Sequence, residues 1–181
     1  MEQTVTLMSA PTSIQPGGYV PVAYADRTEP VTRHAEVTVE PIGHGWSIAL
    51  GWDCPDPVRD IARETDRFVD ACAVFAPETA QAPWITMGAA GMAVQGWLWR
   101  ADKASPLQVR AEGLGTMERS AAPTGTQLTA EWAHGRWRVV LTLPEWPALA
   151  SQRRMALAIW RGAAQERAGL KSVSPDWIAI A

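Results

Sequence analysis

Bulky residues alternate with small or polar residues along much of this chain, most regularly in two runs. Residues 46–52 read WSIALGW, and residues 137–143 read WRVVLTL. A period of two is typical of a β-strand that turns one side to a hydrophobic core. We therefore predict strands here and, from less regular alternation, in six further segments: residues 35–41, 68–75, 93–100, 107–112, 127–133 and 155–160.

Turn-forming residues separate these segments. His-Gly pairs at 44–45 and 134–135 stand between predicted strands, where glycine can supply the positive φ of a tight hairpin turn. Residues 9–18 and 113–126 are rich in small residues and proline, which predicts long loops.

Helical patterning is scarce. Residues 57–67 predict one short helix, and residues 163–168 predict another turn or two. Many short strands joined by turns favour a mainly β fold, and we predict an antiparallel β-sandwich of two sheets with a few short helices. No internal repeat or linker interrupts the chain, so residues 1–181 are expected to form a single domain that is long enough to bury a sizeable core.

The overall composition narrows the class of function. Hydrophobic residues make up 47% of the chain and include ten tryptophans, as expected of a packed globular protein. The net charge is −3 and no basic cluster is present, which disfavours nucleic-acid binding because phosphate neutralisation needs concentrated Lys and Arg. No apolar run approaches the roughly 20 residues of a membrane-spanning helix, so we expect no membrane span.

Common catalytic and metal-binding motifs are absent from the sequence. It contains no GxGxxG after a strand, no P-loop, no GxSxG and no HExxH. Cys54, Cys72 and the three histidines lack the spacing of a zinc site, and CxxCH, the attachment signal of covalently bound haem, is missing. We interpret both cysteines as buried free thiols, with a disulfide as the alternative.

Lysine is rare in this chain, which contains only Lys103 and Lys171 beside fourteen arginines. An arginine side chain stays charged, whereas a buried lysine can lose its proton and offer a lone pair. Because a neutral amine can bind a metal ion, Lys171 is the leading candidate for a functional residue; a stray surface lysine is the alternative. Lys103, in a predicted loop before Pro106, is interpreted as a surface residue.

A second candidate lies in residues 83–102, where Met87 precedes a loop of small residues and a strand with two tryptophans on one face. A thioether beside a glycine can approach a flat cofactor closely, because little side-chain bulk stands in the way. The alternative is that Met87 fills a gap in the core and the two tryptophans pack beneath the sheet.

Several segments, taken together and in order, resemble a known protein family. Residues 46–181 are similar to the haem-b-binding gamma subunits of ethylbenzene dehydrogenase, dimethylsulfide dehydrogenase, chlorate reductase and selenate reductase, within the type II dimethylsulfoxide reductase family. Each segment alone is only weakly specific for this family, whereas the whole set in this order is much more specific. The segments are 51–53 (GWD), 68–75 (FVDACAVF), 87–88 (MG), 97–102 (WLWRAD), 113–116 (GLGT), 135–140 (GRWRVV), 157–162 (LAIWRG) and 166–174 (ERAGLKSVS).

The resemblance implies a β-sandwich that binds one haem b without covalent attachment, with the iron ligated by Met87 and Lys171. Met92, five residues further on, is the alternative sulfur ligand if the loop has a different register. With both axial positions filled by side chains, the chain is expected to transfer electrons and to contain no catalytic residue of its own.

The resemblance also implies partners and a compartment. The expected complex is a heterotrimer in which a catalytic alpha subunit carries molybdopterin and a beta subunit carries iron–sulfur clusters, with a soluble c-type cytochrome or similar carrier as electron partner. Members of the family are exported, so we expect a periplasmic protein whose leader is absent from this sequence.

Further side chains are candidates for contact with the haem. Its carboxylates need cationic partners, and three arginines flank the ligand segments, although solvated strand-end charges are an equal alternative: Arg100, Arg161 and Arg167. Three tryptophans are candidates to line the porphyrin, with a general core role as the alternative: Trp97, Trp99 and Trp160. A competing hypothesis for the whole chain is a non-catalytic β-sandwich module that binds carbohydrate or protein through surface tryptophans.

Overall fold

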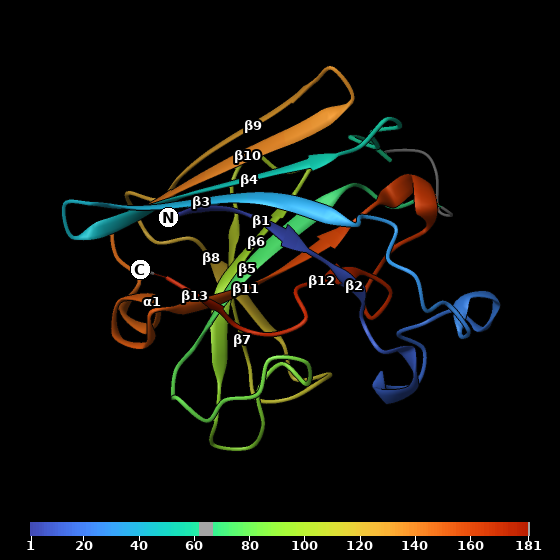
Figure 1. Ribbon diagram of the computed structural model, residues 1–181, viewed down its shortest axis with the longest axis horizontal. Coiled ribbons are helices and arrows are strands. Elements are labelled where there is room, and N and C mark those ends of the chain that lie inside the picture. The colour runs from blue at the N-terminus through green and yellow to red at the C-terminus, as the bar shows by residue number, and fades with distance from the viewer. Residues whose placement is uncertain (62–66, 181) are drawn as a thin grey trace.

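Two antiparallel β-sheets make up the computed structural model, which describes residues 1–61 and 67–180 (Figure 1). The five-stranded sheet has the order β1-β3-β4-β10-β9. Its strands are β1 (Glu2–Thr6), β3 (His34–Ile42), β4 (Gly45–Asp53), β9 (Gln127–Ala133) and β10 (Arg136–Leu143).

The eight-stranded sheet has the order β2-β12-β11-β5-β6-β7-β8, and β13 pairs with β11 beside this path. Its strands are β2 (Met8–Ser9), β5 (Ala71–Pro77), β6 (Val94–Arg100), β7 (Leu107–Ala111), β8 (Glu118–Ala121), β11 (Arg154–Trp160), β12 (Ser172–Val173) and β13 (Ile178–Ala179). The mainly β prediction, with two antiparallel sheets and few short helices, is confirmed.

Helical structure is confined to short pieces. The described residues contain one α-helix, α1 (Pro147–Gln152), and three 3-10 turns: η1 (Thr12–Ile14), η2 (Val22–Tyr24) and η3 (Gly162–Ala164). Of the helix predicted over 57–67, residues 62–66 lie outside the described residues, and the described remainder is not helical. The helix predicted over 163–168 is reduced to η3, and no described helix is long and apolar enough to cross a bilayer.

Both predicted hairpin turns are present. Between β9 and β10 the turn is formed by His134 and Gly135, whose φ values of 51° and 76° match a type I′ turn. Between β3 and β4 the turn is shifted by one residue, because Gly43, with a φ of 60°, takes the left-handed position before His44. Gly45 instead packs so closely against the β10 end of the sheet that a side chain would not fit.

The main hydrophobic core lies between the sheets and is built around tryptophan. Trp99 packs edge-on against Trp137 with ring centroids 5.0 Å apart, and Trp52 contacts both rings. Such edge-to-face pairs add stability beyond the apolar area that they bury. Cys54 and Cys72 belong to this core as free thiols, as predicted, and burial raises the pKa of Cys54 to about 12.

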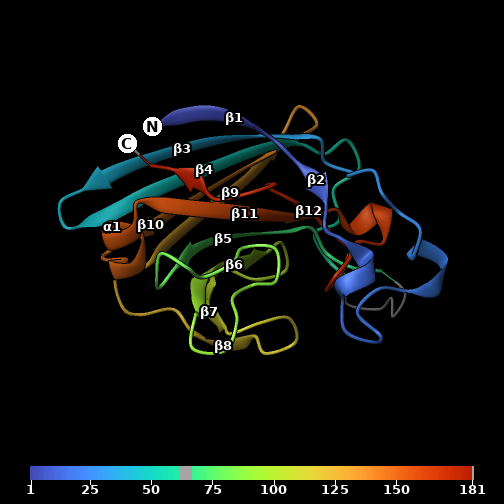
Figure 2. The same cartoon turned by 60° about the horizontal axis from the view of Figure 1, so that its bottom comes forward.

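The eight-stranded sheet is also buried on its outer face. All seven residues of β5 are buried, which explains why this segment reads as a continuous apolar run rather than an alternating one. The outer face carries a second cluster that includes Phe75, Trp84, Met87 and Trp160. Figure 2 shows the loops around β6, β7 and β8 in front of this sheet, and the blue segment after β2 beside the red segment before β12.

Candidate functional site

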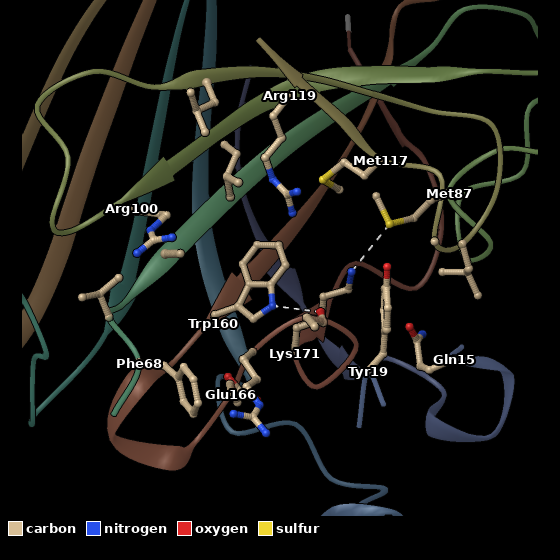
Figure 3. A pocket seen from close by; sticks show the side chains of 18 of the residues that line it. Gln15, Tyr19, Phe68, Met87, Arg100, Met117, Arg119, Trp160, Glu166 and Lys171 are labelled. Carbon is tan, nitrogen blue, oxygen red and sulfur yellow. Dashed lines mark hydrogen bonds between the residues drawn. The ribbon is translucent and has the colours of Figure 1, made fainter. Parts of the chain in front are cut away.

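A cavity of about 370 Å³ opens on the outer face of the eight-stranded sheet. Its wall is formed by side chains of β5, β6, β7 and β11, and loops near residues 15–19, 113–117 and 166–171 enclose the remaining sides. The volume lies within the range of roughly 300–1,000 Å³ that is usual for cofactor and ligand sites. Figure 3 shows the labelled side chains converging on this space.

Lys171 stands just before β12 and directs its amine into the cavity. Its backbone oxygen accepts a hydrogen bond from Ala10 at 2.9 Å, which ties it to the segment after β2. The residue is only 6% exposed, and within the described chain no carboxylate forms an ion pair with it. Because burial removes water from the ammonium group, the pKa of Lys171 falls to about 8.

Met87 approaches the same space from a tight turn after residues 83–86. Its φ of 56° is unusual for a residue with a side chain and costs on the order of 1 kcal/mol. Hydrogen bonds fix the conformation: the Met87 N–H donates to Trp84, and its oxygen accepts from Gly113. Gly88 follows because a side chain there would collide with the oxygen of Met92.

The amine and the thioether meet inside the cavity. Lys171 Nζ lies 3.7 Å from Met87 Sδ, and 5.1 Å from the centre of the Trp160 ring (Figure 3). Once the amine has lost its proton, both side chains offer a lone pair to a metal ion, and both lie at the same cavity. Lys171 and Met87 would therefore fit as ligands of one metal centre.

The rest of the wall fits a flat apolar group rather than a bare ion. Phe75, Leu98 and Leu107 line the sheet side, and Trp160 is held in place by a hydrogen bond of 3.1 Å to Ala168. No group of three His, Cys, Asp or Glu side chains that could hold a metal ion occurs among the described residues. A thioether and a buried amine that ligates once it has lost its proton, set between apolar walls, would fit an iron porphyrin, whose four ring nitrogens supply the other ligands.

Trp97 and Trp99 do not lie in the cavity. Successive residues of a strand point to opposite faces, and in β6 it is Leu98 and Arg100 that line the cavity. Both tryptophans therefore point into the core between the sheets, where Trp97 packs against Trp146. These two rings do not line the cavity, whereas Trp160 does.

The predicted arginines divide into those inside and those outside the cavity. Arg100 and Arg167 line it, Arg100 in a bidentate pair with Asp102 at 2.8 and 3.0 Å. Arg167 stacks over Phe68, with its guanidinium 4.4 Å from the ring centre. Arg161 is buried and does not line the cavity.

Met92, the alternative sulfur ligand, also lies outside the cavity. It pairs with Ala89 in an isolated bridge that closes the small-residue loop. Lys103 is exposed, as predicted for a surface residue. Among the residues that line this cavity, Met117 is the second thioether (Figure 3).

Several cavity residues were not predicted from the sequence. Arg119 reaches in from β8, and Tyr19 from the segment after β2. Glu166 is only 2% exposed and forms an ion pair with Arg27 at 3.8 Å. Burial raises the pKa of Glu166 to about 7, although the Arg161 backbone N–H and Arg27 oppose the shift.

The chain is similar in sequence to several known proteins. No family model matches the chain. Three curated relatives do: a protein named as a respiratory nitrate reductase heme subunit of Haloferax mediterranei (35% identity), the chlorate reductase subunit gamma of Ideonella dechloratans (35%) and the dimethylsulfide dehydrogenase subunit gamma of Rhodovulum sulfidophilum (32%). Each match covers 72% of this chain. The chain belongs to the family of these subunits.

Family membership confirms the resemblance drawn from the ordered motifs. The chain spans about half the length of these relatives, namely 49%, 57% and 54%.

Proposed function

We propose that this chain is the haem-b-binding electron-transfer subunit of a periplasmic molybdenum oxidoreductase, with Met87 and Lys171 as the axial ligands of the iron. The observation that carries the proposal is the meeting of a buried amine and a thioether, 3.7 Å apart, inside a cavity with apolar walls. The names of the relatives, which are heme and gamma subunits of reductases and a dehydrogenase, support the same class of function.

The side chains of the pair are suited to this task. Lys171 can ligate iron only as a neutral amine, and burial, which lowers its pKa to about 8, favours that form. The Met87 thioether is a soft ligand that favours ferrous iron and raises the reduction potential. When bound, the haem supplies a one-electron couple.

Arginines at the cavity provide partners for the haem carboxylates. Arg119 has no carboxylate partner within the described residues, so its guanidinium is free to bind one. Arg100 and Arg167 also line the cavity, but Asp102 already occupies Arg100. Arg119 and Arg167 are therefore the first choices among the three.

A subunit with both axial positions filled has no place for a substrate, so the chain itself is not an enzyme in this proposal. Its partners are a molybdopterin-containing alpha subunit, an iron–sulfur beta subunit and a soluble electron carrier such as a c-type cytochrome. Periplasmic location belongs to the same proposal.

The competing function is a binding module that recognises carbohydrate through exposed tryptophans. Eight of the ten tryptophans are buried, and the other two, Trp132 and Trp177, are partly buried. A module of that kind needs an exposed aromatic platform, so the burial of these rings weighs against it.

Titration of the haem-free protein with hemin tests the proposal. We expect one equivalent to bind, with a Soret band and sharp α and β bands on reduction, and no carbon monoxide adduct. Met87→Ala should open one axial position and admit carbon monoxide, whereas the matched control Met92→Ala should not. A protein that takes up no hemin contradicts the proposal and favours the binding module.

A further inference from the structure

A second hollow, of about 280 Å³, lies where the two sheets separate beside β9. We call it the tryptophan groove, and its lining residues are Arg59, Trp99, Ala101, Lys103, Ala104, Leu128, Ala130, Trp132 and Trp137. In Figure 1 the β9–β10 hairpin projects at this edge of the molecule. The groove shares no lining residue with the cavity on the outer face.

Three indole rings form the floor of the groove. Trp132 and Trp137 are register partners on β9 and β10, and Trp137 packs against Trp99 at 5.0 Å. The indole N–H of Trp132 donates to the Cys54 oxygen, and that of Trp137 to Asp70. These polar atoms are therefore satisfied inside the protein. Trp99 and Trp137 are buried beneath the groove, and Trp132 is the partly buried ring at its surface.

Two cations border this floor. The guanidinium of Arg59 lies 5.1 Å from the ring centre of Trp132 and 5.4 Å from that of Trp137. Neither Arg59 nor the exposed Lys103 forms an ion pair with any described carboxylate, in contrast to Arg136, which contacts Glu36 and Asp53 at 2.9 Å. In a chain of net charge −3, such a site attracts an anionic partner.

The groove and the cavity are separated by one strand. Trp99 lies on β6 between Leu98 and Arg100, which line the cavity on the other side of the sheet. The cavity mouth would be one approach to a cofactor bound there, and the groove would be a second, on the opposite face of the sheet beside Trp99.

We propose that the tryptophan groove docks a carboxylate-bearing surface of a soluble redox carrier, with Arg59 and Lys103 as the recognition residues. The nature of this partner rests on the proposed function, whereas anion binding by the groove does not. The carrier accepts one electron from, or donates one to, the cofactor, and the indole of Trp99 occupies the space between them.

Anion binding is tested on the haem-free protein with hexacyanocobaltate, a redox-inert trianion. We expect the indole N–H resonances of Trp132 and Trp137 to shift on titration, and Lys103→Gln and Arg59→Gln each to weaken binding several-fold. Arg138→Gln, an equal charge change on the exposed side of β10, should leave binding unchanged. Equal weakening by all three variants, or no shift of either indole resonance, overturns the inference.

Electron exchange is tested on the haem-loaded, reduced protein with ferricyanide, which has the same shape and charge as hexacyanocobaltate. Lys103→Gln combined with Arg59→Gln should lower the second-order oxidation rate roughly tenfold at low salt, and less at high salt. A rate no lower than that of Arg138→Gln overturns the docking inference while the Soret band leaves the haem proposal intact. A protein that takes up no haem contradicts the proposed function, and the redox-carrier inference falls with it.

Discussion

The two faces of the eight-stranded sheet differ in the kind of side chain that they bury. The face toward the other sheet carries neutral, fully buried rings such as Trp52 and Trp99, which pack against each other. The outer face carries a buried amine, a carboxyl with a raised pKa and a methionine in the left-handed region: Lys171, Glu166 and Met87. Natural folds accept such destabilising groups at functional sites, where the rest of the structure compensates for them.

The largest change in the free energy of unfolding is expected for a substitution on the face of the sheet that packs in the core. Trp52→Ala should lower the free energy of unfolding by about 3–5 kcal/mol, because the ring is buried on all sides and leaves a cavity that the sheets cannot fill. Leu98→Ala, on the cavity face of β6, should cost clearly less because the side chain is only partly buried. Denaturant unfolding of the two haem-free variants measures both free-energy changes. Equal losses of stability would contradict the difference between the two faces of the sheet.

A gain in stability is expected on the cavity side. Lys171→Met should raise the free energy of unfolding of the haem-free protein at pH 7 by roughly 1–3 kcal/mol, because it removes a buried ammonium without a partner. The folded-state pKa is lowered to about 8, so the burial cost is present in full below that pH. The cost disappears as the pH rises toward the unfolded-state pKa.

The stability of the wild type relative to Lys171→Met should therefore increase between pH 8 and about 10.4. The comparison cancels the opposing effect of the buried cysteines, whose raised pKa lowers the stability of both proteins in this range. Chemical denaturation at a series of pH values checks this slope. The same variant should lose high-affinity hemin binding, which separates the functional role of the lysine from its structural cost. A variant that is less stable than the wild type at pH 7 contradicts the prediction.

An effect with the opposite pH dependence is expected from Glu166. Its folded-state pKa is raised to about 7, so its contribution to stability is fully present at acidic pH and is lost as the pH rises through that value. The difference between the folded and unfolded pKa values corresponds to roughly 3 kcal/mol at most. The wild-type protein should lose stability from about pH 4.5 to pH 7, and Glu166→Gln should not. Glu131→Gln, at an exposed position of β9, serves as the matched control and should keep the wild-type slope.

The smallest effect is expected from the second thioether of the cavity. Met117→Leu conserves volume and should change stability by less than about 1.5 kcal/mol. Its haem-loaded form should keep the wild-type absorption spectrum and remain unreactive toward carbon monoxide. Carbon monoxide binding by this variant would assign the sulfur ligand to Met117 instead of Met87.

The sequence predicted the regular strands well and the short or exposed ones poorly. β4 and β10 alternate bulky and small residues, so their period was visible. β8 lies in the segment 113–126, whose many small residues and prolines predict a loop, and its four exposed residues show no apolar alternation. β12 has only two residues, too few to show a period. Pairing with neighbouring strands, which a single sequence does not reveal, makes them part of the sheet.

The site was predicted in part, for reasons that depend on the residue. Lys171 was found because lysine is rare in this chain, and the resemblance linked it to Met87. Alternation on β6 shows that Trp97 and Trp99 share one face, but only the packing of the second sheet decides that this face is the core. Arg119 could not be found because its strand carries no pattern.

The absorption spectrum of the haem-loaded Lys171→Arg variant, compared with the wild type, tests the central claim most directly. The substitution conserves charge, but a guanidinium does not ligate iron. The wild type should show the sharp reduced bands of six-coordinate, low-spin haem, and Lys171→Arg should lose them. An unchanged low-spin spectrum in the variant would contradict ligation by Lys171.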